Sequence, residues 1–158
     1  MAKLTDRQAA EYLYRSYTSA DGLWFMKVEE RHGFDEALEI DNEVWKVVPK
    51  IQARMLKAML GAGTGPDALL ECFSAKLDLE GFKFDTLKDG DGIRICITRC
   101  PWYELMAKSG RGHLSDKVSE LICLTEYSVW GSEFGGLKFE RGSRICKGDK
   151  ECVLRFLP

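Results

Sequence analysis

The sequence predicts an α+β fold in which N-terminal helices pack on a four-stranded antiparallel sheet made of two hairpins separated by helices. Apolar residues recur every three or four positions up to about residue 80, and beyond it they alternate in short segments. The expected strands come in pairs and do not alternate singly with helices, which favours α+β over a doubly wound sheet. We expect a single domain over 1–158, with a mainly helical part at 1–80 and a ββααββ cysteine-bearing part at 81–158.

The first two expected helices are defined by their end signals. Thr5 and Gln8 have the spacing of a capping box, which satisfies two free amides at a helix start. Asp21-Gly22 is expected to separate this helix from a second one, which ends near His32.

Two proline-marked helices are expected next. The third runs from about 35 to 60, and Pro49 should kink it because proline removes a backbone donor. Pro66 suits the first turn of the fourth.

The second part begins with the clearest pattern in the chain. The turn from Asp89 to Gly92 separates two alternating segments, which predicts a β-hairpin with one apolar face. Helical segments are expected over 102–108 and 116–130, and further strands near 137–139 and 152–156. The apolar face of the hairpin carries Phe82, Phe84, Ile93, Ile95 and Ile97.

Composition narrows the function classes. Charged residues make up 30% of the chain, the net charge is -2, and Lys and Arg are scattered, so nucleic acid is not an expected partner. The apolar runs are short and the first residues carry no signal core, so we expect a cytoplasmic protein without a membrane partner. Six cysteines in a reducing compartment indicate free thiols, thiolate chemistry, metal ligation or plain packing.

The helix expected at 116–130 carries the first candidate site. Glu120, Cys123, then Glu126 or Tyr127, and finally Trp130 recur at three- and four-residue intervals and therefore share a face. They form a thiol and carboxylate constellation, with Glu120 and Tyr127 as substrate contacts, or else Glu120 and Glu126 are solvated and Cys123 marks the edge of the core.

A second candidate lies where the hairpin ends. In Arg99-Cys100-Pro101-Trp102, proline holds Cys100 extended at the end of a strand, beside an aromatic wall. Cys100 is thus a candidate nucleophile or metal ligand, with Arg99 and Trp102 as substrate contacts, or it only packs under Trp102. His113, in a glycine-flanked loop, is the candidate imidazole base.

A metal site is the alternative use of the thiols. Cys100, Cys123, Cys146 and Cys152 are the candidate ligands, for zinc or iron, although no Cys-x-x-Cys pair is present. Cys146 and Cys152 flank a turn and could approach each other across it.

Three segments carry a resemblance to known families. Arg99-Cys100-Pro101, Cys123-Leu124-Thr125-Glu126 and the stretch from Arg144 through Gly148 and Cys152 to Phe156 resemble the 2-aminothiazoline-4-carboxylate hydrolase family. A second pattern is also similar to one in 4-vinyl reductase-type ligand-binding domains. It consists of Gly148, Cys152 four residues later, and the apolar strand that follows. The stretches 14–25 and 41–45 resemble an uncharacterised prokaryotic branch allied to that hydrolase.

The resemblance implies an activity and a set of residues. The hydrolase opens a small thiazoline ring to an N-carbamoyl cysteine, and Cys100, Cys123 and Glu126 would line its site. Glu126 stands where the family is expected to have Asp. The zinc site of the reductase-type relatives uses two cysteines, a glutamate and a third cysteine; Cys152 fits the last position, whereas Arg141 and Arg144 occupy the preceding Glu-x-x-Cys positions.

Three hypotheses follow. The first is an enzyme that hydrolyses a C–N bond of a small cyclic or amide substrate, with Cys100 or Cys123 as nucleophile, Glu126 or His113 as base, and Trp102 and Tyr127 as pocket walls. The second is a non-catalytic binding domain for a small molecule or a metal. The third is a homodimeric assembly module, with the Trp- and Met-bearing helix as its interface.

Overall fold

The computed structural model describes residues 3–158, which form two compact units, one up to Asp41 and one from Asn42 onward. The expectation of a single domain stays a prediction. Within residues 3–158, no helix is both long and apolar enough to cross a membrane.

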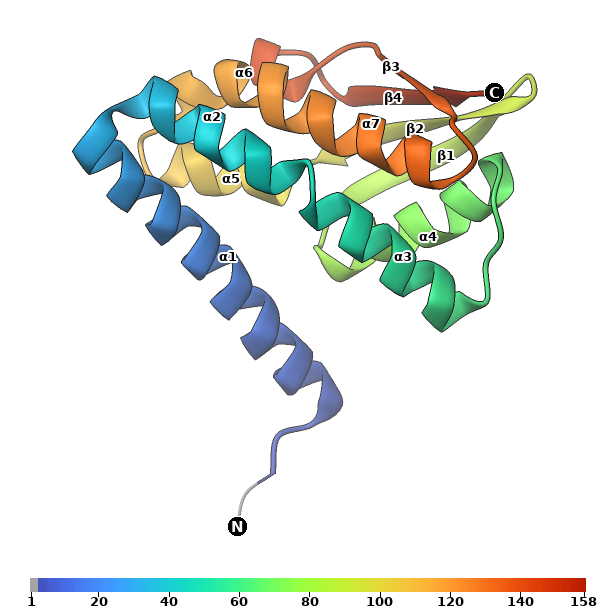
Figure 1. Ribbon diagram of the computed structural model, residues 1–158, viewed down its shortest axis with the longest axis horizontal. Coiled ribbons are helices and arrows are strands. Elements are labelled where there is room, and N and C mark those ends of the chain that lie inside the picture. Colours follow the sequence, from blue (N-terminus) through green and yellow to red (C-terminus); the bar gives the residue numbers. More distant parts are fainter. Residues whose placement is uncertain (1–2) are drawn as a thin grey trace. The chain divides into compact units, whose positions relative to one another are not determined.

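The first unit consists mainly of helix α1, Asp6–His32, which leads into α2, Phe34–Trp45 (Figure 1). The predicted capping box is confirmed: the Gln8 amide donates to the Thr5 Oγ1 atom at 3.2 Å, and the Thr5 amide donates to the Gln8 side chain at 2.9 Å. The predicted break at Asp21-Gly22 is wrong, because α1 runs through it. One glycine inside a helix costs only about 1 kcal/mol, too little to end the helix.

Helices α3, Val48–Leu60, and α4, Pro66–Leu79, belong to the second unit. The predicted continuous helix over 35–60 is wrong, since α2 ends at Trp45 and a new helix begins at Val48. Pro49 stands in the first turn of α3, where its missing amide hydrogen costs no intrahelical bond. Pro66 opens α4 as predicted.

A four-stranded antiparallel sheet follows, in the order β1-β2-β4-β3. The first hairpin joins β1, Lys83–Asp89, to β2, Gly92–Arg99; the second pairs β3, Lys138–Arg141, with β4, Cys152–Leu157. The α+β prediction is therefore confirmed, with the two hairpins joined by the pairing of β2 with β4.

The helices between the two hairpins are α5, Pro101–Lys108, a 3₁₀ turn at Gly112–Leu114, α6, Ser115–Val118, and α7, Leu124–Glu133. A π-helical turn, Ser119–Cys123, joins α6 to α7. The helix expected at 116–130 thus exists, but a wider turn interrupts its α-helical spacing. Such π turns often mark functional positions.

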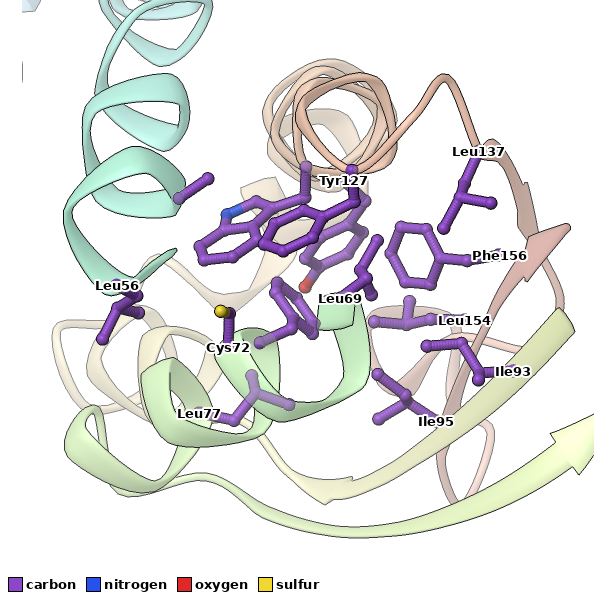
Figure 2. Packing of buried hydrophobic residues seen from close by; sticks show 14 of the residues in the cluster. Leu56, Leu69, Cys72, Leu77, Ile93, Ile95, Tyr127, Leu137, Leu154 and Phe156 are labelled. Carbon is purple, nitrogen blue, oxygen red and sulfur yellow. The ribbon is translucent and has the colours of Figure 1, made fainter. Parts of the chain in front are cut away.

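The core of the second unit lies between one face of the sheet and helices α3, α4 and α7 (Figures 1 and 2). Helix α4 contacts β1 and β2, α7 contacts β3, and α3 packs on α4 and α7. In Figure 2, Leu69, Cys72 and Leu77 from α4 and Tyr127 from α7 belong to the same cluster as the sheet residues Ile93, Ile95, Leu154 and Phe156. As predicted, the apolar face of β2 points inward; its buried residues are Ile93, Ile95 and Ile97, opposite Leu154 and Phe156 of β4.

Candidate functional site

A small cavity of about 80 Å³ lies within the second unit. Ile97 and Leu154 of the sheet form one wall, and α5, the π turn and the connection between β3 and β4 form the others. Its lining consists mostly of aliphatic, aromatic and thiol-bearing side chains: Phe82, Ile97, Cys100, Trp102, Tyr103, Met106, Ser115, Val118, Ser119, Cys123, Tyr127, Arg141, Ser143, Arg144, Ile145, Cys146, Cys152 and Leu154.

The thiols predicted as a group are brought together at this cavity. Cys100, Cys123, Cys146 and Cys152 come from four separate segments, and all line it. Cys100 stands at the end of β2 with an extended backbone (φ -115°, ψ 109°), and Pro101 begins α5, as the sequence predicts. Trp102 and Tyr127, predicted as pocket walls, also line the cavity.

Burial keeps Cys100, Cys123 and Cys152 protonated at neutral pH. It raises the pKa of Cys100 to about 11, although the backbone amides of Tyr103 and Trp102 act in the opposite direction. Burial and the charge of Glu126 raise the pKa of Cys123 still further above its usual range. Burial also raises the pKa of Cys152, whose sulfur accepts a hydrogen bond from the Ile145 amide at 3.2 Å. A thiolate nucleophile is therefore not preformed at Cys100, Cys123 or Cys152.

This protonation predicts slow alkylation. At neutral pH, Cys100 and Cys123 of the native protein should react with iodoacetamide at least about tenfold more slowly than in the denatured chain, because the thiolate is the reactive species. The rate for Cys100 should keep rising toward pH 11, its pKa being about 11. Mass spectrometry of peptides from timed reactions measures each rate, and fast labelling of native Cys100 near neutral pH would contradict the burial argument.

A buried ion cluster includes the predicted catalytic Glu126. Lys76 Nζ of α4 lies 2.7 Å from Glu126 Oε1 and 3.0 Å from Glu80 Oε2, and each side chain is less than one-tenth exposed (5%, 9% and 8%). The Trp102 indole donates to Glu80 Oε2 at 3.5 Å, which links the cluster to the cavity wall. The ammonium also lies 5.6 Å from the centre of the Phe73 ring.

The pKa shifts in this cluster follow from burial and pairing. Burial alone would lower the pKa of Lys76, but attraction by Glu126 and Glu80 outweighs it and raises that pKa above its usual value. Burial raises the pKa of Glu126. The positive charge of Lys76 opposes this shift, and the negative charge of Glu80 adds a smaller increase. Lys76 stays charged, and Glu126 is the carboxyl group whose charge acts on Cys100 and Cys123.

The π turn divides the face on which four site residues were expected to line up. Cys123 and Tyr127 line the cavity and Glu126 joins Lys76, but Glu120 does not line it. Glu120 is about half exposed and pairs with Arg141 at 2.5 Å and with Arg144 at 2.6 Å. A π turn closes its hydrogen bonds over five residues, so spacings of three and four no longer share one face.

Two other predicted residues also lie away from the cavity lining. His113 is exposed in the 3₁₀ turn before α6. Arg99 makes a two-point contact with Glu104 at 2.8 and 2.7 Å and donates to the Gly81 carbonyl at 2.9 Å. The roles predicted for His113 as a base, and for Arg99 and Glu120 as substrate contacts, stay predictions.

Sequence reasoning missed Lys76 and Glu80. The signal was present, since Lys76 falls four residues after Cys72 and three after Phe73, both fully buried on α4. A lysine in an apolar stripe needs a buried partner of opposite charge, and Glu80 is in place one turn later. The other partner, Glu126, could be identified only from the fold.

The metal hypothesis concerns the same thiols. Among residues 3–158, no group of three or more His, Cys, Asp or Glu side chains is arranged to hold a metal ion. A zinc or iron site at Cys100, Cys123, Cys146 and Cys152 stays a prediction.

The homodimer hypothesis concerns the expected Trp- and Met-bearing helix, which the structure divides: Trp45 ends α2 and is buried, whereas Met55 and Met59 lie on α3. Three apolar side chains one turn apart are exposed on α3: Ile51, Met55 and Met59. Assembly through this surface also stays a prediction.

Comparison with known proteins yields one match. Residues 5–139 match the sequence model of a family described as a family of unknown function (DUF6125). No curated protein and no solved structure matches the chain. The match includes Lys76, Cys100, Cys123 and Glu126, and it ends before Arg144 and β4.

Proposed function

Because the chain belongs to a family of unknown function, we propose its function from its own side chains: it is a binding domain for a compact, neutral, mostly apolar molecule, held in the cavity beneath α5 and the π turn. The observation that carries this proposal is a cavity wall made mostly of carbon and thiol groups, in which the charged groups are already paired.

The size of the cavity limits the ligand. Its volume is about 80 Å³. For comparison, water occupies about 30 Å³ in the liquid, and an apolar cavity of about 150 Å³ in another protein accepts benzene. A ligand of a few non-hydrogen atoms fits directly, and one small ring fits if a flexible side chain such as Met106 moves.

The charges at the wall favour a neutral ligand. Arg141 and Arg144 reach the cavity, but Arg141 pairs with Glu120, and Arg144 pairs with both Glu120 and Asp116. A ligand anion would have to displace one of these carboxylates, and a cation would meet two guanidinium groups. The hydroxyl groups of Ser115, Ser119 and Ser143 can hydrogen-bond a neutral polar atom.

A second candidate function is hydrolysis of a C–N bond, favoured by one observation. The charge of Glu126 acts on both Cys100 and Cys123, and burial raises the pKa of Glu126 toward the range of a general base. In that reaction the Cys123 sulfur would attack the carbon of the C–N bond as Glu126 takes the thiol proton. The C–N bond would then break as Glu126 returns that proton to the leaving nitrogen, and water would cleave the new S–C bond to regenerate the thiol. Lys76 would stay charged beside Glu126. The high pKa of the thiols and the tight pairing of Glu126 with Lys76 place this second.

Filling the cavity tests the binding proposal. Val118 lines the cavity, whereas Val129 of α7 is also partly buried but does not line it. With a panel of neutral single-ring compounds such as phenol and thiazole, Val118→Phe should weaken binding at least about tenfold, because a ring takes the ligand's volume. Val129→Phe should leave binding unchanged. Saturation-transfer NMR and calorimetry measure both.

The outcomes separate the two candidates. Binding that is equal in Val118→Phe and wild type, or no binding of any compound, would contradict the binding proposal. Turnover of a small cyclic amide or thiazoline that disappears in Cys123→Ser would favour the hydrolase instead.

A further inference from the structure

We propose that residues 142–151, which connect β3 to β4, form a lid over the cavity, and that ion pairs to α6 and the π turn hold this lid closed. The inference rests on the proposed function, because it concerns access to the same cavity. The lid is defined here as residues 142–151.

The lid forms one whole side of the cavity. Ser143, Arg144, Ile145 and Cys146 line it, and the remaining lining residues lie on the sheet and on the segments around α5, α6 and α7. Figure 1 shows this connection arching away from β3 and returning beside α6 before β4 begins. Movement of the lid would open the cavity that Cys123 also lines.

Ion pairs join the lid to the helical wall. Arg144 has a side chain only 8% exposed and lies 3.0 Å from Asp116 and 2.6 Å from Glu120. Arg141, just before the lid, contacts Glu120 at 2.5 Å and donates to the Ser119 carbonyl at 2.9 Å. Asp116 and Glu120 are about half exposed (47% and 48%), so salt can screen them and water can replace them.

The lid is also braced within itself. The Arg144 amide donates to Asp149 Oδ2 at 2.8 Å, and the Gly148 amide donates to the Ile145 carbonyl at 2.9 Å. Two backbone hydrogen bonds fix the base of the lid to Val153 of β4. The Gly142 amide donates to the Val153 carbonyl at 2.8 Å, and the Val153 amide donates to the Ser143 carbonyl at 3.0 Å. A segment held at its base and braced inside can swing as a unit once the ion pairs open.

Glu120→Gln is the variant that tests the lid. It removes one charge from the half-exposed side of the ion pairs and leaves the buried arginine in place. Alkylation of Cys123 by iodoacetamide, followed at alkaline pH where the thiol ionises, should become about tenfold faster, because hydrogen bonds to charged groups are lost. High salt should accelerate labelling of wild type and have less effect on the variant.

Two controls isolate the lid from other effects. Glu140→Gln removes a comparable carboxylate, paired with Lys138 and Arg155 on the sheet, and should leave the Cys123 rate unchanged. Cys72 is fully buried and does not line the cavity, so its labelling reports global unfolding. If the lid opens, the Cys123 rate rises at every pH without a shift in the midpoint of its pH profile.

Each outcome decides the inference. Faster labelling of Cys123 with unchanged Cys72, together with faster amide exchange in residues 142–151 but not in β4, would support the lid. An unchanged Cys123 rate in Glu120→Gln, or equal acceleration of Cys72, would overturn it. Labelling uses no ligand, so a protein that binds none of the tested compounds can still show the lid, and one that binds them can still lack it.

Discussion

Replacing Lys76 with methionine is expected to lower the free energy of unfolding by about 3–5 kcal/mol, because it leaves Glu80 and Glu126 buried without their cation. Both carboxylates lie within 3.0 Å of the Lys76 ammonium, and all three side chains are nearly excluded from water. Chemical denaturation followed by circular dichroism measures the loss.

The pH dependence of this variant has a definite sign. Burial already raises the pKa of Glu126, and removal of the opposing Lys76 charge raises it further in the folded state. The folded variant then binds more protons than the unfolded chain, so its stability should fall as pH rises above the ordinary glutamate pKa of about 4.3. The destabilisation relative to wild type should thus be smaller at mildly acidic pH than at neutral pH.

Matched variants distinguish burial from charge. Lys88 pairs with Asp67 at 3.1 Å, but both side chains are largely exposed (74% and 79%), so Lys88→Met should cost at most about 1 kcal/mol. Replacing Lys76, Glu80 and Glu126 together by methionine or leucine should restore much of the stability lost by Lys76→Met. If Lys76→Met cost no more than Lys88→Met, the ion cluster would not be buried as described.

Phe73→Ala is the second large change, expected to cost about 3–5 kcal/mol through lost burial and the cavity that it leaves. The Phe73 ring is fully buried and makes edge-to-face contacts with Trp130 at 4.9 Å and with Tyr127 and Phe156 at 5.8 Å. It therefore joins α4, α7 and β4 at one point.

The control for Phe73 is an apolar residue at the surface. Leu87 lies on the edge strand β1 and is 54% exposed, so Leu87→Ala should change the free energy of unfolding by less than about 0.5 kcal/mol. The same denaturation experiment measures both variants. A loss below about 1 kcal/mol in Phe73→Ala would mean that the three elements do not meet through this ring.

Local patterns in the sequence were enough to predict the hairpins and part of the cavity. Alternation over Ile93, Ile95 and Ile97 specifies which face of β2 is buried, because a strand has a period of two residues. Pro101 specifies an extended Cys100 at the start of a helix. Both structural preferences depend only on residues close together in the sequence.

Two predicted features of the helices are wrong because a single glycine or proline need not by itself end or kink a helix. Gly22 was expected to end a helix, but its small cost does not stop α1. Pro49 was expected to kink a helix, whereas the chain ends one helix at Trp45 and uses the proline to begin the next.

The remaining parts of the site depend on contacts between distant segments. The π turn at Ser119–Cys123 moves Glu120 away from Cys123, and no residue in it signals the wider turn. Pairing of Lys76 with Glu126 requires α4 and α7 to lie on the same sheet face. Such contacts follow from tertiary packing, which sequence periodicity does not specify.

The measurement that tests the central claim most directly is protection of Cys100 and Cys123 from alkylation by two ring compounds of similar size, phenol and benzoate. If the cavity binds compact neutral molecules, phenol should slow labelling of both cysteines without affecting Cys72, and benzoate should have little effect, because the wall arginines are already paired. Stronger protection by benzoate, or none by either compound while both cysteines label rapidly near neutral pH, would contradict the account.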